Sequence, residues 1–218
     1  MKLLAHQTED FESPIVTVHE ALRLRRQSPE EWEGRPFFDI IRLRPMVPVD
    51  RGARSSSFAF LGGAGGGHSL GSKGIAHELV QEYVCKLRTW PIRVFGKEFL
   101  LRIDSAADEW RVQDPQTGTP YFVDCQLVLT PKSDLYHETG GILGVEVTDT
   151  HKTGQRKKKA LARAGQVVME LQMIPDWHIP NELGATSEEL RILRARIRGL
   201  LHKGTRLSCL CKPLGVRI

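Results

Sequence analysis

The sequence predicts an α/β fold in which a mixed central sheet is flanked by helices. Apolar residues recur at helical spacing between residues 73 and 88, and several strand-like runs separated by turn residues follow, up to residue 148. A helix at 154–164 then precedes a further strand at 166–173. The order is therefore helix, several strands, helix, strand, which favours helices packed on a sheet.

The first seventy residues carry weaker patterns. They predict a helix over 17–26, a capped helix start at Ser28, and a strand over 38–43. A glycine-rich run at 62–67 is typical of a loop or connector. We therefore expect an N-terminal extension or small subdomain at 1–70, a core at 71–180, and a C-terminal helix and tail at 181–218 packed on that core.

Within the core, the helix over 73–88 is expected to end before Pro91. Strands are expected at 92–95 and 97–103 around Gly96, at 110–112, at 121–129 after a turn at 114–120, and at 141–148. These strands indicate an antiparallel meander. Residues 187–202 form a last helix with one broad apolar stripe, and 206–212 a short tail element.

Composition and charge narrow the class of protein. The chain has 218 residues, 40% of them hydrophobic and 26% charged, which is ordinary for a globular protein with one main domain. No apolar run is long enough to span a bilayer, and the first six residues do not form a secretory signal, so we expect a cytoplasmic protein without a membrane partner. The four cysteines fall mostly in apolar patterns and predict reduced, buried thiols.

Two carboxylates inside apolar strands are the main functional signal. Asp124 lies in the run 121–129, and Glu146 lies in the run 141–148. A carboxylate among β-branched residues loses hydration, so it shifts its pKa or finds a cation. Neighbouring strands lie about 4.8 Å apart, so the two acids could share one divalent ion. The alternative is structural: Asp124 caps a strand end and Glu146 faces solvent at a sheet edge.

Basic residues are concentrated after the Glu146 strand. The formal net charge is only +5, but a dense run follows at 156–163, and five more cations lie between residues 191 and 203. Such stripes attract phosphate backbones, although a solvated helix face gives the same pattern. The candidates for nucleic-acid contact are Lys152, Arg156, Lys157, Lys158 and Arg163.

The order of elements, with a carboxylate in each of two strands and a basic helix after the second, resembles the PD-(D/E)XK nuclease superfamily over residues 72–173. The segments 58–68, 77–82, 123–126 and 144–149 are most similar to the competence-protein family often called CoiA-like. The resemblance implies a restriction-endonuclease-like αβββαβ core. It also implies Mg²⁺ or Mn²⁺ as cofactor and a metal site formed by Glu78, Asp124 and Glu146.

One position departs from the superfamily pattern. Thr148 occupies the place of the usual lysine and cannot supply a cation to the attacking water or the developing phosphorane charge. His151 or Lys152, just downstream, could reach back into the site, and His77 could orient the water or contact phosphate. An ordinary strand threonine and a locally packed helix histidine are the alternative interpretations of Thr148 and His77.

Other motifs do not support a different chemistry. The glycine-rich segment ending at Lys73 lacks the Gly-Lys-Ser/Thr end of a phosphate-binding loop, and His77-Glu78 lacks the second histidine of a zinc protease. Cys209 and Cys211 have no second ligand pair at zinc-finger spacing, so core packing of the tail is favoured.

The resulting expectation is a metal-dependent DNA nuclease, with Asp124, Glu146, Thr148 and His77 at the site of hydrolysis, acting in DNA processing, mobile-element biology or defence. The alternative is a catalytically degenerate protein of the same fold that binds nucleic acid or a partner protein in a larger complex. A protein partner would use the N-terminal section or the C-terminal helix.

Overall fold

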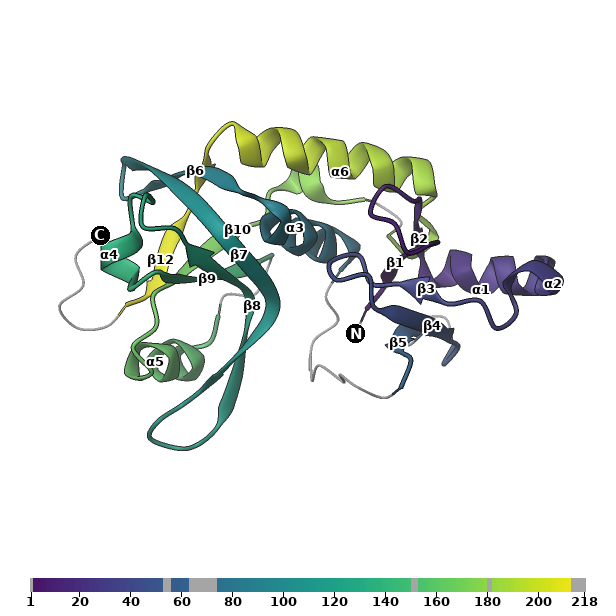
Figure 1. Cartoon of the computed structure of the whole chain (residues 1–218), viewed down its shortest axis with the longest axis horizontal. Helices are drawn as coiled ribbons and strands as arrows, with labels where there is room; N and C mark the ends of the chain where they lie inside the picture. Colours follow the sequence, from purple (N-terminus) through teal and green to yellow (C-terminus); the bar gives the residue numbers. More distant parts are fainter. Residues whose placement is uncertain (1, 53–55, 63–73, 150–152, 180–181, 213–218) are drawn as a thin grey trace. The chain divides into compact units, whose positions relative to one another are not determined.

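A computed structural model describes residues 2–52, 56–62, 74–149, 153–179 and 182–212 (Figure 1). Contacts divide the chain into two compact units, one formed by Met1–Leu79 and Asp176–Arg196 and the other by Val80–Pro175 and Ile197–Ile218. Each unit contains its own sheet, and the coarse α/β class expected from the sequence is confirmed. In the described part of the chain, no helix is long and apolar enough to cross a membrane.

The first unit contains a five-stranded antiparallel sheet in the order β2-β1-β3-β4-β5. Its strands are short, which explains why the sequence patterns here were weak: two to five residues give little alternation to detect. Their bounds are Leu4–His6 (β1), Ile15–Thr17 (β2), Phe37–Phe38 (β3), Pro45–Val49 (β4) and Ser57–Phe60 (β5).

Helix α1, Val18–Gln27, confirms the helix expected over 17–26. It begins at Thr17, whose hydroxyl accepts a hydrogen bond from the Glu20 N–H at 3.2 Å, as an N-cap threonine should. Helix α2, Pro29–Trp32, follows Ser28, and the Trp32 ring stacks on Phe37.

The strand predicted over 38–43 was wrong beyond Phe38. The Asp39 carboxylate accepts hydrogen bonds from the N–H groups of Ile41 and Arg42, so the backbone turns after β3 instead of continuing along the sheet.

The second unit contains a seven-stranded mixed sheet in the order β11-β6-β7-β8-β9-β10-β12. Strand β10 runs parallel to β9, and β11 parallel to β6; the other neighbours are antiparallel. The bounds are Thr89–Val94 (β6), Lys97–Gln113 (β7), Pro120–Leu129 (β8), Ile142–Thr148 (β9), Val168–Gln172 (β10), Thr205–Arg206 (β11) and Ser208–Cys211 (β12).

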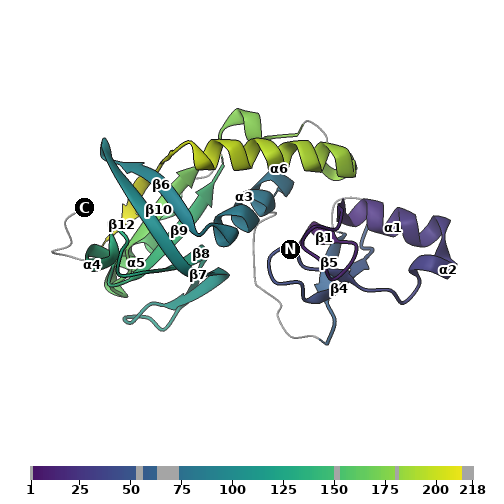
Figure 2. The ribbon, with the colours of Figure 1, turned by 45° about the horizontal axis from the view of Figure 1, so that its top comes forward.

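Two sequence expectations in this sheet need correction. The helix before Pro91 ends as expected, at Lys86, but Pro91 lies within β6, which begins at Thr89 and not at residue 92. Residues 110–112 do not form a strand of their own, because β7 continues without a break for 17 residues. The long β7 and β8 strands form a strongly curved hairpin, visible in Figures 1 and 2.

The helices α3 (Ile75–Lys86), α5 (Gln155–Arg163) and α6 (Ser187–His202) confirm the three helices expected after residue 70. The sequence did not predict the short helix α4 (Tyr136–Thr139) or the 3₁₀ turns at Pro175–Trp177 and Glu182–Gly184. Both α3 and α6 run along the chain from one unit into the other. On α6 the buried apolar residues are Leu190, Leu193, Ile197 and Leu201, whereas Ile192 is exposed.

A core cluster joins α5 to the sheet of the second unit. Its buried members, contributed by β7, β8, α5, β10 and β12, are Val112, Val123, Leu161, Val168, Leu210 and Cys211. Burying these side chains fixes α5 on one face of the sheet, next to the strand that carries Glu146.

Candidate active site

The β7–β8 hairpin bends at Asp124. Cys125 contacts the Gln81 carbonyl of α3, yet Val123, two residues earlier, packs in the α5 cluster. In a regular strand these two side chains would point to the same face. On β7, Glu109 lies between Asp108, which pairs with Cys125, and Trp110, which pairs with Val123; Glu109 has a φ of 52°, a rare conformation for a residue other than glycine. Asp124 and Glu109 therefore lie opposite each other at the bend.

Where the backbone pairing of β8 with β9 ends, the Asp124 carboxylate accepts the next hydrogen bond from β9. The last registered pair is Cys125 with Val145, and beyond it Asp124 Oδ2 accepts a hydrogen bond from the Val147 N–H at 2.9 Å. The Asp124 carbonyl accepts a second bond, from Gln81 Nε2 at 2.6 Å. Asp124 is only 8% exposed, so these bonds hold the buried carboxylate one residue away from Glu146 along β9.

Glu146 lies on the face of the sheet covered by α5. It shares one side of β9 with Gly144, over which Val168 and Val123 of the core cluster pack. The Glu146 side chain is 7% exposed, and its Oε1 lies 2.5 Å from the Lys157 ammonium of α5. A charge-assisted contact of this length compensates much of the cost of burying the carboxylate. Glu146 is thus not an edge residue facing solvent.

Glu170 is a further acid at this site that the sequence analysis did not single out. It pairs with Glu146 in the parallel register of β9 and β10, so both side chains leave the sheet on the same face. Its Oε1 is buried and accepts no hydrogen bond within the described residues, whereas Oε2 accepts one from Ser208 at 3.4 Å. The signal was present in the sequence, because Glu170 also interrupts an apolar strand.

Thr148 provides no charge to the site. It is buried, and its hydroxyl donates a hydrogen bond to Gln172 Oε1 at 3.4 Å, while Gln172 Nε2 donates one to the Asp149 carbonyl at 2.6 Å. His151 and Lys152, which were considered as replacements for the lysine, lie outside the described residues. Among the described cations, Lys157 is in ionic contact with Glu146.

Glu78 binds the N-terminal strand of the first unit. Its carboxylate accepts hydrogen bonds from the Leu3 and Leu4 N–H groups at 2.9–3.2 Å. Burial raises the pKa of Glu78 to about 6, although nearby Lys2 and these hydrogen bonds act in the opposite direction. The contacts that define its position therefore belong to the first unit. His77, also in the first turn of α3, is half-buried.

The basic residues of α5 divide into two groups. Arg156 is exposed, and Lys157 and Lys158 are half-buried. Arg163 instead holds the buried Asp114 through two bonds, of 3.1 and 2.6 Å, which anchor the end of α5 to the turn between β7 and β8. The Arg163 guanidinium lowers the pKa of Asp114 to about 2, so this pair is ionised throughout the physiological range.

The side chains suit a hard divalent cation by their chemistry. Mg²⁺ prefers oxygen ligands, keeps several waters and commonly takes only one or two protein carboxylates, which Asp124 and Glu146 can supply. Within the ranges that the structure describes, no three His, Cys, Asp or Glu side chains are grouped in a way that could hold a metal ion. Cys211 packs in the core, where burial raises the pKa of its thiol to about 11.

The arrangement as a whole places the Asp124 carboxylate of β8 against the backbone N–H that follows Glu146 on β9. A further acid, Glu170, lies in register with Glu146, and a lysine ammonium contacts Glu146. Such a group can bind a cation and contact a phosphate. Comparisons of the chain with models of known protein families, with curated proteins and with solved structures gave no match.

Proposed function

We propose that the chain is a metal-dependent DNA nuclease with a restriction-endonuclease-like core, in which Lys157 supplies the positive charge that Thr148 lacks. The observation that carries this proposal is the contact of 2.5 Å between Lys157 Nζ and Glu146 Oε1. It puts a cation from α5 beside one of two buried strand carboxylates. This is the charge that the superfamily pattern places two residues after Glu146.

The order of elements supports the proposed core. Helix α3 is followed by β7, β8 and β9, then by α5 and β10, and these strands are neighbours in the sheet. Strand β10 is parallel to β9, with α5 as the connection. The order resembles the αβββαβ pattern implied by the resemblance, with β6 inserted between α3 and β7 and the short α4 inserted between β8 and β9.

Each residue of the site has a role in the proposed hydrolysis of a phosphodiester. Asp124 and Glu146 would hold the divalent cation, and Glu170 adds a negative charge in register with Glu146. When bound, the cation would polarise the phosphate and lower the pKa of a water. Lys157 stabilises the negative charge that develops on the phosphate, while the ion pair with Glu146 orients its ammonium. Gln81 and the Val147 N–H hold Asp124 in place.

Cleavage of plasmid, linear duplex and single-stranded DNA, with Mg²⁺ or Mn²⁺ or with a chelator, tests the proposal. Asp124→Asn and Glu146→Gln are suitable variants, because an asparagine oxygen can still accept the Val147 hydrogen bond and the glutamine keeps the volume of Glu146. We expect metal-dependent cleavage by the wild type and a loss of about a hundredfold or more in each variant. Asp104→Asn, the same chemical change at an exposed position of β7, is the matched control.

Calorimetric titration with Mn²⁺ gives a second readout. Both site variants should bind the ion more weakly while keeping the thermal midpoint of the wild type. If the wild type binds DNA but neither binds Mn²⁺ nor cuts any substrate, the protein is a catalytically degenerate nucleic-acid binder, the alternative that is consistent with Thr148 in place of the usual lysine. Unfolding of both variants would instead show that the carboxylates are structural.

A further inference from the structure

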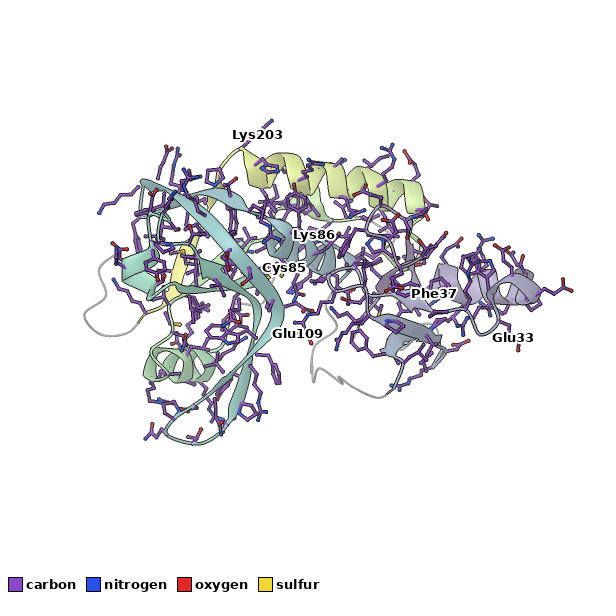
Figure 3. The ribbon with its side chains drawn as sticks, viewed as in Figure 1. Glu33, Phe37, Cys85, Lys86, Glu109 and Lys203 are labelled. Carbon is purple, nitrogen blue, oxygen red and sulfur yellow. The ribbon has the colours of Figure 1, made fainter. Side chains whose placement is uncertain are left out.

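A second polar site lies near the β11–β6 edge of the sheet in the second unit, away from the strands that carry Asp124 and Glu146. A hollow of about 510 Å³ is formed by β6, the β6–β7 turn and the segment that follows α6. Its lining includes Arg93, Gly96, Phe99, Lys203, Gly204 and Arg206. Figure 3 shows Lys203 at the turn after α6, where the chain leads into β11. The volume falls within the range of pockets that hold small ligands.

Three cations meet at this hollow. Arg206 pairs with Arg93 in the parallel register of β11 and β6, so the two guanidinium groups leave the sheet on the same face. Lys203 adds a third charge, and Glu98, which forms an ion pair with Arg93, provides one negative charge. Like charges side by side on neighbouring strands are unfavourable, and a bound anion would relieve their repulsion.

The segment 203–206, which carries two of these cations, is held in place by hydrogen bonds of Thr205. The buried Trp90 donates its indole N–H to Thr205 Oγ1 at 3.0 Å, and the Thr205 hydroxyl donates to the Leu201 carbonyl. Gly96 and Gly204 both have positive φ, and neither has any atom within 4 Å of the position of an added Cβ, so the rim stays open. A rigid basic pocket loses little conformational entropy on binding.

We propose that this pocket binds a nucleotide unit of a single-stranded nucleic acid, with the phosphate held by Arg93, Lys203 and Arg206 and the base against Phe95. Phe99 pairs with Ile92 and so leaves the sheet on the face opposite Arg93, whereas Phe95, next to Gly96 at the tip of the same hairpin, is 67% exposed. An exposed aromatic ring near phosphate-binding cations is the combination that single-strand sites use. The pocket deepens the proposed function, since it rests on nucleic acid being the substrate.

The position of the pocket gives it a role separate from hydrolysis. Strand β6 is three places from β9 in the sheet, or about 14 Å at the usual spacing between strands. A strand of DNA whose scissile phosphate lies at Glu146 could therefore be held a few nucleotides away. The pocket would fix where along the strand the cut falls.

Binding of a labelled single-stranded oligonucleotide, measured in chelator so that no cleavage occurs, tests this proposal. The variant Arg93→Gln/Lys203→Gln/Arg206→Gln should bind at least tenfold more weakly at about 0.1 M salt, and its slope of log affinity against log salt should be about 2 units shallower. The control Arg102→Gln/Arg111→Gln/Lys132→Gln removes the same charge from exposed positions of the same unit outside the pocket, and should change binding much less. Phe95→Leu should weaken binding about fivefold.

Other outcomes would contradict the proposal that the pocket binds a single-stranded nucleic acid. Equal weakening by the two triple variants would show that only net charge matters, and absence of binding by the wild type would remove the ligand. Displacement of the oligonucleotide by equimolar free mononucleotide would identify a small molecule as the occupant. If pocket variants bind normally while the wild type cuts DNA, the pocket proposal fails and the nuclease stands. If the pocket variants bind weakly while the wild type never cuts DNA, the pocket proposal stands and the nuclease proposal fails.

Discussion

Glu146 and Lys157 form an ion pair whose members come from consecutive elements, β9 and α5. Thr148 leaves the strand without a cation, and the helix that follows brings one to the same carboxylate. A lysine on a neighbouring helix has the reach to do so because its stem is long and flexible. The residue that replaces a missing charge is thus defined by its distance from Glu146 and not by its spacing in the sequence.

Replacing Lys157 tests this view at the residue scale. Lys157→Gln should lower the rate of cleavage by about a hundredfold, because the developing charge on the phosphate loses its cation, whereas Lys157→Arg should retain a measurable part of the rate. Single-turnover cleavage at saturating Mg²⁺ measures both. Cleavage by Lys157→Gln at the wild-type rate would contradict the role of Lys157 in stabilising the phosphate charge. His151 and Lys152 would then be the remaining candidates for that role.

At the scale of elements, the contact between β9 and its neighbours depends on a residue without a side chain. A Cβ on Gly144 would come within 2.9 Å of Val168 Cγ2 and 3.2 Å of Val123 Cγ1, and both neighbours are stiff β-branched residues. We expect Gly144→Ala to lower the free energy of unfolding by about 1–3 kcal/mol, measured by urea denaturation.

Gly199, within α6, is the matched control. A Cβ there would meet no atom within 4 Å, and alanine favours the helix, so Gly199→Ala should raise the free energy of unfolding by up to about 1 kcal/mol. If both alanine variants changed stability in the same direction, the close packing of β9 against β10 and β8 would not be the cause.

The cations of helix α5 have different roles, and the salt dependence of DNA affinity distinguishes the roles of Lys158 and Arg163. Lys158 is half-buried, one residue after Lys157, whereas Arg163 is held by Asp114 in two hydrogen bonds. We expect Lys158→Gln to reduce the slope of log affinity for duplex DNA against log salt by about 0.9, and Arg163→Gln to leave it nearly unchanged while lowering stability. An equal loss of slope in both variants would show that Arg163 contacts phosphate as well.

At the scale of the whole molecule, Glu78 makes stability depend on pH. Its pKa in the folded chain is about 6, above the ordinary value of 4.5, chiefly because of burial. The folded state therefore binds more protons than the unfolded state between these values, and stability falls as pH rises from about 4.5 to 6. The shift corresponds to about 2 kcal/mol.

Urea denaturation across this pH range checks the contribution of Glu78. Glu78→Gln should remove the decline, because the amide does not titrate and its oxygen can still accept the Leu3 and Leu4 hydrogen bonds. The variant should be at least as stable as the wild type above pH 6. A decline of the same size in both proteins would assign the pH dependence to another group.

The sequence by itself determined most elements of the second unit. Periodic apolar patterns over ten or more residues located α3 and α6, and apolar runs bounded by turn residues located β8 and β9, because these patterns reflect which face of each element is buried. The same reasoning singled out Asp124 and Glu146, since a carboxylate in an apolar strand is costly wherever that strand packs. Short strands such as β1 to β3 carry too few residues for this signal.

Only the tertiary structure decided which side chains meet. The bend at Asp124, the contact of Lys157 with Glu146 and the register that aligns Glu170 with Glu146 all depend on strand pairing and on the crossing of α5 over the sheet. The two arginines at the β11–β6 edge come together across more than a hundred residues of sequence. A local pattern reports burial along one element, whereas distances between elements follow from the packing of the whole unit.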